Sequence, residues 1–418
     1  MQQFTKNRQY YKFCLYGFFK NLKFFEPFLM LFFLDKGITF LQIGTLYAIR
    51  EISINILEIP TGVIADVLGR KKTMMSSFVG YIISFVIFYA SPSFGWLAVA
   101  MLFFSFGDAM RTGTHKAIIF DYLKTQGWLH EKVTYYGHTR SWSQIGSAVS
   151  SIIAAAIVIF TGNYKMVFLV STLPYIADLI LIWSYPQSLD GPLKTDNNVN
   201  KRQNIKLLAK NTIASFKIKS LWVTILNLST YQGYFKAMKD YLQPIIVLAI
   251  SSTLILNNEN HKNNSAIAIG VIYFFIYLIS SFSSRHSGKV VGWLKTPEKA
   301  INYTLIIGLL AGVATGGLIS GENSSWAIIL FIVIYIIQNI RKPIGTGLVA
   351  DKVKNEVLAT GLSIQSQLDS VFAAIFAIIT GFMVDVFGIG KALFFLGLIL
   401  LIASLFLQLK PTIKPEQR

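Results

Sequence analysis

The sequence is short of charge. Only 14% of its 418 residues are Asp, Glu, Lys or Arg, whereas an ordinary soluble protein carries about a quarter. A soluble chain of this length needs a mostly polar surface, and so few charges do not supply one. The single cysteine, Cys14, excludes a disulfide scaffold. The mean hydropathy of +0.54 excludes a disordered chain. These absences leave a polytopic membrane protein.

Acidic residues are scarcer than basic ones: 20 Asp and Glu stand against 38 Lys and Arg, which gives a net charge of +18. A nucleic-acid partner does not explain this excess, because nucleic-acid interfaces need more polar surface than this composition offers. The positions of the basic residues explain it instead. Twenty-six lie in the two tails and in alternate loops, and four lie in the opposite loops. We therefore expect a multi-pass protein of the plasma (inner) membrane with both termini in the cytoplasm.

Long apolar runs divide the chain into twelve expected spans, since a membrane helix needs about 20 mostly apolar residues. These runs cover residues 13–34, 41–65, 73–91, 95–119, 135–160, 166–184, 220–250, 266–284, 300–320, 326–349, 358–383 and 392–409. The longest polar interruption follows the sixth run. We predict an all-α membrane protein of twelve transmembrane helices, with one six-helix bundle over 1–184, a cytoplasmic linker over 185–216 and a second six-helix bundle over 217–418.

The turn after the second span carries the most specific motif, Gly-x3-Asp-x2-Gly-Arg-Lys-Lys. Its residues are Gly62, Asp66, Gly69, Arg70, Lys71 and Lys72. The two glycines permit close helix approach and a sharp reversal. The aspartate lies at the membrane edge, where it can accept hydrogen bonds from a helix amino terminus or pair with the arginine. The three basic residues anchor the turn at the anionic cytoplasmic leaflet.

This motif resembles the first inner-loop signature of the major facilitator superfamily, whose members are secondary transporters built as two six-helix halves. The lead-in Glu-Ile-Pro-Thr-Gly over 58–62 resembles a group of bacterial members with unassigned substrates, and the stretch over 112–123 is similar to the fourth-span pattern of that group. The resemblance implies two pseudo-symmetric bundles, alternating access, a small-molecule substrate and a conformational role for the six motif residues. It also implies a cavity surrounded by the first, second, fourth, fifth, seventh, eighth, tenth and eleventh spans.

One pattern of the superfamily is absent. Members that export drugs by proton antiport commonly carry Gly-x3-Gly-Pro-x2-Gly-Gly in the fifth span, whereas this span has neither the proline nor the paired glycines after Gly146. The direction of transport therefore stays open. Proton-coupled efflux is the expectation from similar bacterial chains. The alternative is proton-coupled uptake of an anionic or zwitterionic nutrient or metabolite, which suits the dense charge on the first, second and seventh spans.

Ionisable residues inside the spans are the candidate functional residues, because each costs roughly 2.5–3.5 kcal/mol at mid-membrane on insertion scales. Six acids and six bases lie at mid-depth, which is also what mutually paired structural charges would give. For proton coupling the candidates are Glu26, Glu51 and Asp108. For the substrate cavity they are Asn21, Lys23, Arg50, Asn55, Arg111, Tyr231, Gln232, Lys236, Gln338, Gln365 and Asp369.

The sequence carries none of the motifs of an enzyme or a pump. A nucleotide-binding Gly-x4-Gly-Lys-Ser/Thr loop, a His-Glu-x-x-His pair and a Gly-x-Ser-x-Gly elbow are all missing. The five histidines show no metal-ligand spacing. We therefore expect no enzymatic activity, no cofactor and no metal. The expected partners are a small-molecule substrate, protons and membrane lipid, with no nucleic acid, and the expected state is a monomer.

Overall fold

The computed structural model describes residues 4–190, 219–253, 261–353 and 358–410, and every regular element in these ranges is helical. Nine of the described helical segments are long and apolar enough to cross a membrane. They correspond to nine of the expected spans. Their helices are α4 (Arg70–Ala90), α5 (Phe94–Arg111) with α6 (Thr114–Thr125), α7 (Lys132–Thr161), α8 (Met166–Trp183), α12 (His261–Arg285), α14 (Pro297–Ser320), α15 (Ser324–Lys352), α16 (Leu358–Phe387) and α17 (Ile389–Ser404).

The remaining three spans are more polar or interrupted. The first consists of α1 (Arg8–Lys20), η1 (Glu26–Phe28) and α2 (Leu29–Asp35). The second is α3 (Phe40–Leu68), and the seventh consists of α10 (Lys219–Met238), η4 (Lys239–Tyr241) and α11 (Leu242–Thr253). The all-α prediction and the twelve-helix plan are confirmed.

The breaks in the first and seventh spans have local causes. Asn21 ends α1, and its side-chain amide donates to the Gly17 carbonyl at 2.7 Å. Pro27 then begins a new turn, where its missing N–H costs nothing. In the seventh span the Tyr335 hydroxyl donates to the Lys239 carbonyl at 2.8 Å. Hydrogen bonds from side chains are needed at these breaks, because backbone groups freed inside a membrane must find partners in the protein.

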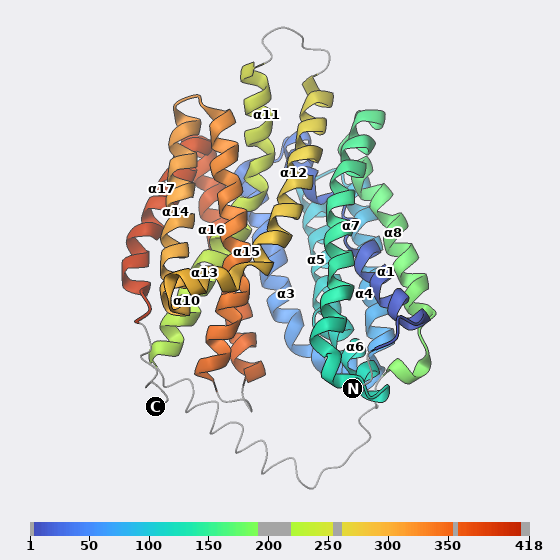
Figure 1. The fold of residues 1–418 in the computed structure, drawn as a ribbon. Coiled ribbons are helices and arrows are strands. Elements are labelled where there is room, and N and C mark those ends of the chain that lie inside the picture. Colours follow the sequence, from blue (N-terminus) through green and yellow to red (C-terminus); the bar gives the residue numbers. More distant parts are fainter. Residues whose placement is uncertain (1–3, 191–218, 254–260, 354–357, 411–418) are drawn as a thin grey trace, which may run out of the picture. The chain divides into compact units, whose positions relative to one another are not determined.

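The contacts divide the chain into two compact units. In the first unit α4 packs against α5 and α8, and α1 packs against α7 and α8; in the second, α14 packs against α15 and α17, and α10 packs against α16 and α15 (Figure 1). The long helices α3 and α12 each contribute residues to both units. Most of the expected linker lies outside the described residues, and the expected division into 1–184, 185–216 and 217–418 stays a prediction.

Small residues set the closest helix approach in the first unit. A Cβ added at Gly146 of α7 would lie 2.5 Å from the Phe18 carbonyl oxygen of α1. Only glycine admits this separation, so α1 and α7 meet backbone to backbone. Large apolar side chains such as Phe160 and Trp183, with 88% and 68% of their surface exposed, point away from the packed interior. Such residues suit contact with lipid rather than water.

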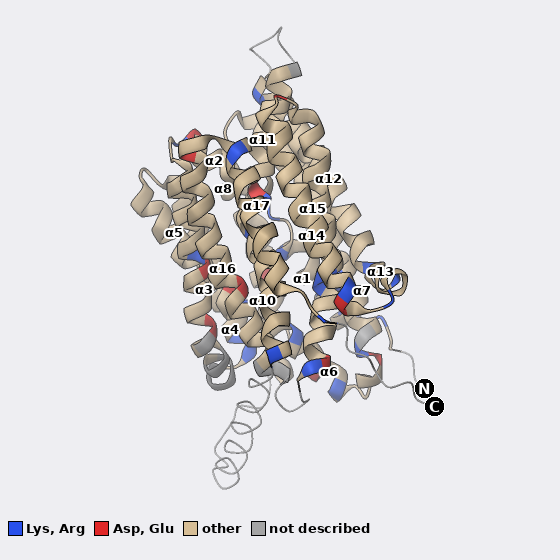
Figure 2. Ribbon diagram, turned by 90° about the vertical axis from the view of Figure 1, so that its left-hand side faces the viewer, with Lys and Arg blue, Asp and Glu red and all other residues tan. Residues whose placement is uncertain are grey.

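Short polar segments interrupt this apolar frame. In Figure 2 blue and red ribbon gathers around α6, whereas α12 is tan between its ends. One further helix, α13 (Ser287–Leu294), lies between α12 and α14, where the sequence predicted only a loop. Its Trp293 side chain is 78% exposed.

Candidate functional site

The inner-loop motif forms a tight turn at the start of α4. Gly69 has φ of +91°, a conformation that other residues rarely adopt. A Cβ there would lie 2.7 Å from the Asp190 carboxylate, which accepts a hydrogen bond from the Lys71 N–H at 2.7 Å. The Lys71 ammonium donates to the Tyr185 carbonyl, also at 2.7 Å. Asp190, in the first residues of the expected linker, therefore caps α4 from 119 residues further along the chain than Lys71.

Arg70 of the motif pairs with Asp121 of α6. The sequence suggested Asp66 as its partner. Gly62 and Asp66 both lie in α3, but their surroundings are outside the described part of the structure. Lys72 is exposed. The motif thus ties α4 to α6 through the arginine and to the end of α8 through the lysine.

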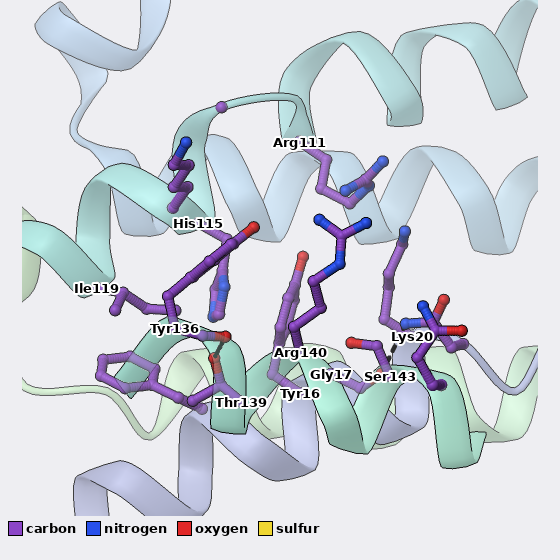
Figure 3. A pocket seen from close by; sticks show the side chains of 15 residues that line it. Tyr16, Gly17, Lys20, Arg111, His115, Ile119, Tyr136, Thr139, Arg140 and Ser143 are labelled. Carbon is purple, nitrogen blue, oxygen red and sulfur yellow. Dashed lines mark hydrogen bonds between the residues drawn. The ribbon is translucent and has the colours of Figure 1, made fainter. Parts of the chain in front are cut away.

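A polar cavity of about 320 Å³ opens between α1, α5, α6 and α7 of the first unit. Its basic lining residues are Lys20, Arg111, Lys116, Arg140 and His115. Its other polar side chains are those of Tyr16, Asn21, Tyr136, Thr139, Ser143 and Gln144. In Figure 3 the side chains of Lys20, Arg111 and Arg140 extend toward one another in the same space. Among the residues that the structure describes, no Asp or Glu lines this cavity.

The cavity brings together two of the residues expected from the sequence, Asn21 and Arg111. Lys20 and Arg140 also line it, although neither was among the residues expected there. Both residues were readable as intramembrane charges, yet only the packing of α1 against α7 shows that they share one cavity with Arg111.

Arg111 is held by a neighbouring acid. Asp108, one helical turn earlier, lies 3.3 Å from the Arg111 guanidinium, and the same oxygen accepts a hydrogen bond from the Tyr81 hydroxyl of α4. The Arg111 Nε donates to that hydroxyl at 3.2 Å. Tyr81 was not predicted, because nothing in the sequence distinguishes it from the other tyrosines. The triad fixes one cation at the cavity wall in a charge-assisted network.

The other two expected coupling acids also lie beside bases. Glu26 is 3.7 Å from Lys23, and Glu51 is 3.0 Å from Arg50. Arg50 borders a small apolar cavity with Phe25, Leu29, Phe88, Met101, Phe104 and Phe168 rather than the polar one. Asn55 is half-buried one turn further along α3. The assignment of Glu26, Glu51 and Asp108 to proton coupling stays a prediction.

A second polar cavity, of about 270 Å³, lies between α10, α15 and α16 of the second unit. Five residues expected from the sequence line it: Gln232, Lys236, Gln338, Gln365 and Asp369. The Gln338 amide donates to the Gln232 carbonyl oxygen, and the Lys236 ammonium donates to the Ser370 hydroxyl at 3.4 Å. Gln232 and Lys236, like Gln365 and Asp369, lie four residues apart and therefore share one face of their helix. Their assignment to the substrate cavity stays a prediction.

Arg341 and Lys342 are cations of this second cavity that were not among the expected residues, and Arg341 is the more firmly held. It is 2% exposed and donates to the Asn227 side-chain oxygen at 2.8 Å and to the Thr304 hydroxyl at 3.0 Å. Its guanidinium lies 4.8 Å from the centre of the Tyr231 ring. Tyr231 is fully buried behind it, and its hydroxyl donates to the Ile334 carbonyl at 3.1 Å. The structure places Arg341, not Tyr231, at the cavity wall.

A comparison with protein families decides the class of this fold. The family model of the Major Facilitator Superfamily matches residues 13–368. The chain belongs to the Major Facilitator Superfamily. A solved bacterial homologue of the human lysosomal transporter Spinster has the same fold, with a TM-score of 0.74 at 14% identity over 96% of this chain and 97% of that one. The resemblance seen in the inner-loop motif is confirmed.

Two curated relatives match shorter stretches. An uncharacterised transporter of the superfamily from Bacillus subtilis, YxaM, is 34% identical over 90 residues, which cover 22% of this chain and 23% of that protein. Mouse thiamine transporter 1 is 31% identical over 155 residues, which cover 36% of this chain and 30% of that protein. The matched stretches thus span less than a third of either relative.

Proposed function

We propose that the protein is a monomeric, proton-coupled secondary transporter of a small anionic or zwitterionic metabolite. The observation that carries this proposal is the lining of the first unit's cavity. Four cations, Lys20, Arg111, Lys116 and Arg140, border a space of about 320 Å³ that no carboxylate of the described chain borders. Within a membrane protein such charges need partners.

A substrate anion supplies the missing partner. Arg111 already lies beside Asp108, whereas Lys20 forms no ion pair with a described residue. A carboxylate or phosphate group in the cavity accepts charge-assisted hydrogen bonds from the lysine and from a guanidinium fork, and these are the stronger class of hydrogen bond. The tyrosine, threonine and serine hydroxyls of the lining add neutral partners for the rest of a polar molecule.

The same lining disfavours a positively charged substrate. The mouse relative is named for thiamine, which is an organic cation, and such a molecule meets four positive side chains in the first cavity. In the second cavity Lys236, Arg341 and Lys342 stand against one carboxylate, that of Asp369. A zwitterion fits this second lining, since both signs of charge are present there.

Two assays test the proposal in sequence. A panel of organic anions, zwitterions and cations is first screened for thermal stabilisation of the purified protein, where we expect the anions or zwitterions to raise the unfolding midpoint. The best stabiliser is then loaded into or around proteoliposomes with an imposed pH gradient. Movement of the substrate in the same direction as the protons indicates uptake by symport. Movement in the opposite direction indicates the efflux expected from similar bacterial chains.

The variant Arg111→Gln tests whether the anion binds in the first unit's cavity. It removes a cavity cation, so the apparent affinity for the selected anion, measured by thermal stabilisation, should fall at least tenfold. Lys72→Gln removes an exposed cation outside the cavity and should leave binding unchanged. Stabilisation by cations alone, or equal affinities in wild type and Arg111→Gln, contradicts the anion site.

A further inference from the structure

Asp178 is an intramembrane acid that the proposed site does not use. It lies in α8, with 0% of its surface exposed. Neither carboxyl oxygen has a hydrogen-bond partner in the described part of the protein. This differs from the acids considered above, because Glu26, Glu51 and Asp108 lie 3.7, 3.0 and 3.3 Å from a basic group.

The groups that surround Asp178 come from the elements packed on α8. The titratable groups that interact with it electrostatically are Tyr16 and Lys20 of α1, Tyr175 of α8 itself and Tyr185 just beyond α8. From α4, Tyr81 packs edge-on against the Tyr175 ring at 5.2 Å. Among the described residues of α4 and α7, no charged side chain interacts with this acid. Among the described residues, Lys20 is therefore the one cation that interacts electrostatically with Asp178.

An ionised carboxylate without hydrogen bonds or a paired cation is very costly in such surroundings, whereas a neutral acid is tolerated. The uncharged, protonated form is thus the one that this site accepts as it stands. Deprotonation creates a negative charge that must draw a partner toward it. Lys20 is that partner, and Lys20 also lines the first unit's cavity.

We propose that Asp178 is a proton-binding site of the first unit and that it competes with the bound anion for Lys20. This inference rests on the proposed function, because it explains how proton and anion binding are linked. With the proton on Asp178, the Lys20 ammonium is available to the anion. When the proton leaves to water, the new carboxylate pairs with Lys20 and the anion loses one of its cations.

The sign of this coupling follows directly. Proton binding and anion binding favour each other, which is the thermodynamic requirement of symport. Tyr16 lines the cavity and interacts electrostatically with both Asp178 and Arg111. The arrangement therefore favours uptake of the anion down a proton gradient.

Infrared spectroscopy of the protein in lipid nanodiscs tests the proton site without any substrate. At pH 7 we expect the carbonyl band of a protonated carboxyl in wild type, and a loss of one carboxyl's intensity in Asp178→Asn. Asp190→Asn, which alters the hydrogen-bonded acid at the α4 turn, should keep the band. If Asp178→Asn does not fold, Asp178→Glu should shift the band's frequency instead. Identical bands in wild type and the folded Asp178 variant overturn the proposal.

The link to Lys20 has its own readout. Lys20 is the cation of the described chain that interacts with Asp178, and removing it makes the carboxylate harder to form. Lys20→Met should therefore raise the pH at which the band disappears. Lys116→Met removes another cation of the same cavity that does not interact with Asp178, and it should leave that pH unchanged. Equal pH values in Lys20→Met and wild type overturn the competition. If the band behaves as expected but no pH gradient drives transport, the proposed function alone has failed.

Discussion

At the scale of single residues, the charges inside the membrane are matched over short distances along the chain. Asp108 and Arg111 are one helical turn apart, and Lys239 lies 3.6 Å from its neighbour Asp240. Local pairing of this kind lets a helix carry charge into the membrane before any tertiary contact forms. The charges that remain without a local partner, such as Lys20 and Asp178, are then the ones available for a ligand or a proton.

The Tyr81 hydroxyl is the tertiary support of the Asp108–Arg111 pair. Tyr81→Phe keeps the buried ring but leaves the carboxylate one donor short, which costs about 1–3 kcal/mol for a buried group. We expect a lower thermal unfolding midpoint and weaker anion binding, because Arg111 is then less firmly held. Tyr89→Phe is the control, since its hydroxyl forms no hydrogen bond with any described residue. Equal midpoints for the two variants would show that the hydroxyl contributes nothing.

A substitution at Gly69 tests whether the turn before α4 must pack closely against Asp190. Gly69→Ala introduces a side chain at a positive φ and 2.7 Å from the carboxylate. Gly127→Ala is the matched control, because Gly127 has φ of +74° with nothing within 4 Å of an added Cβ. We expect Gly69→Ala to slow pH-gradient-driven transport of the selected anion several-fold more than Gly127→Ala. Equal transport rates in the two variants would show that the contact between this turn and Asp190 does not affect transport.

Residue positions were predictable where one helix face carried the signal. Gln232 and Lys236 lie four residues apart in α10, as do Gln365 and Asp369 in α16, and the structure places all four at one cavity. Their role in substrate binding stays a prediction. The sequence could not identify Asp190 or Tyr81, because their roles depend on which helices pack together. A carboxylate outside every motif, such as that of Asp190, gives no signal until its partner is known.

At the scale of elements, the first and seventh spans share a discontinuity. Each begins as a helix, breaks around a Lys and an acid, and resumes, with the breaks at 21–28 and 239–241. Hydropathy averaged over a span does not reveal such breaks, because the apolar residues on both sides continue the run. The short helix α13 escaped prediction for a related reason: eight residues are too few to establish a helical period.

Arg70 and Asp121 join two elements, α4 and α6, and a double-mutant cycle measures that connection. We expect Arg70→Gln and Asp121→Asn each to slow transport of the selected anion while its affinity stays near the wild-type value. The double variant should transport no more slowly than either single variant, because the same ion pair is removed in all three proteins. Rates that multiply in the double variant would indicate two independent effects and contradict a working ion pair.

At the scale of the whole molecule, the positive excess of the sequence has two components. Most of the 38 basic residues lie in tails and loops, where they indicate orientation, and a smaller group lies inside the spans. The low charge content predicted the membrane class, and the apolar runs predicted the twelve spans. The cavities required the structure, because an acid-free lining is a property of several helices together.

The orientation itself is a prediction that single-cysteine labelling tests. Cys14 is the only cysteine and is buried, so Cys14→Ser gives a cysteine-free background. On it, Lys6→Cys marks the amino-terminal tail and Glu322→Cys marks the turn between α14 and α15, and both positions are exposed. In intact cells a membrane-impermeant maleimide should label position 322 and not position 6, because the basic tail stays in the cytoplasm. Labelling at position 6 before lysis contradicts this orientation, and labelling at both positions after lysis confirms that both cysteines are reactive.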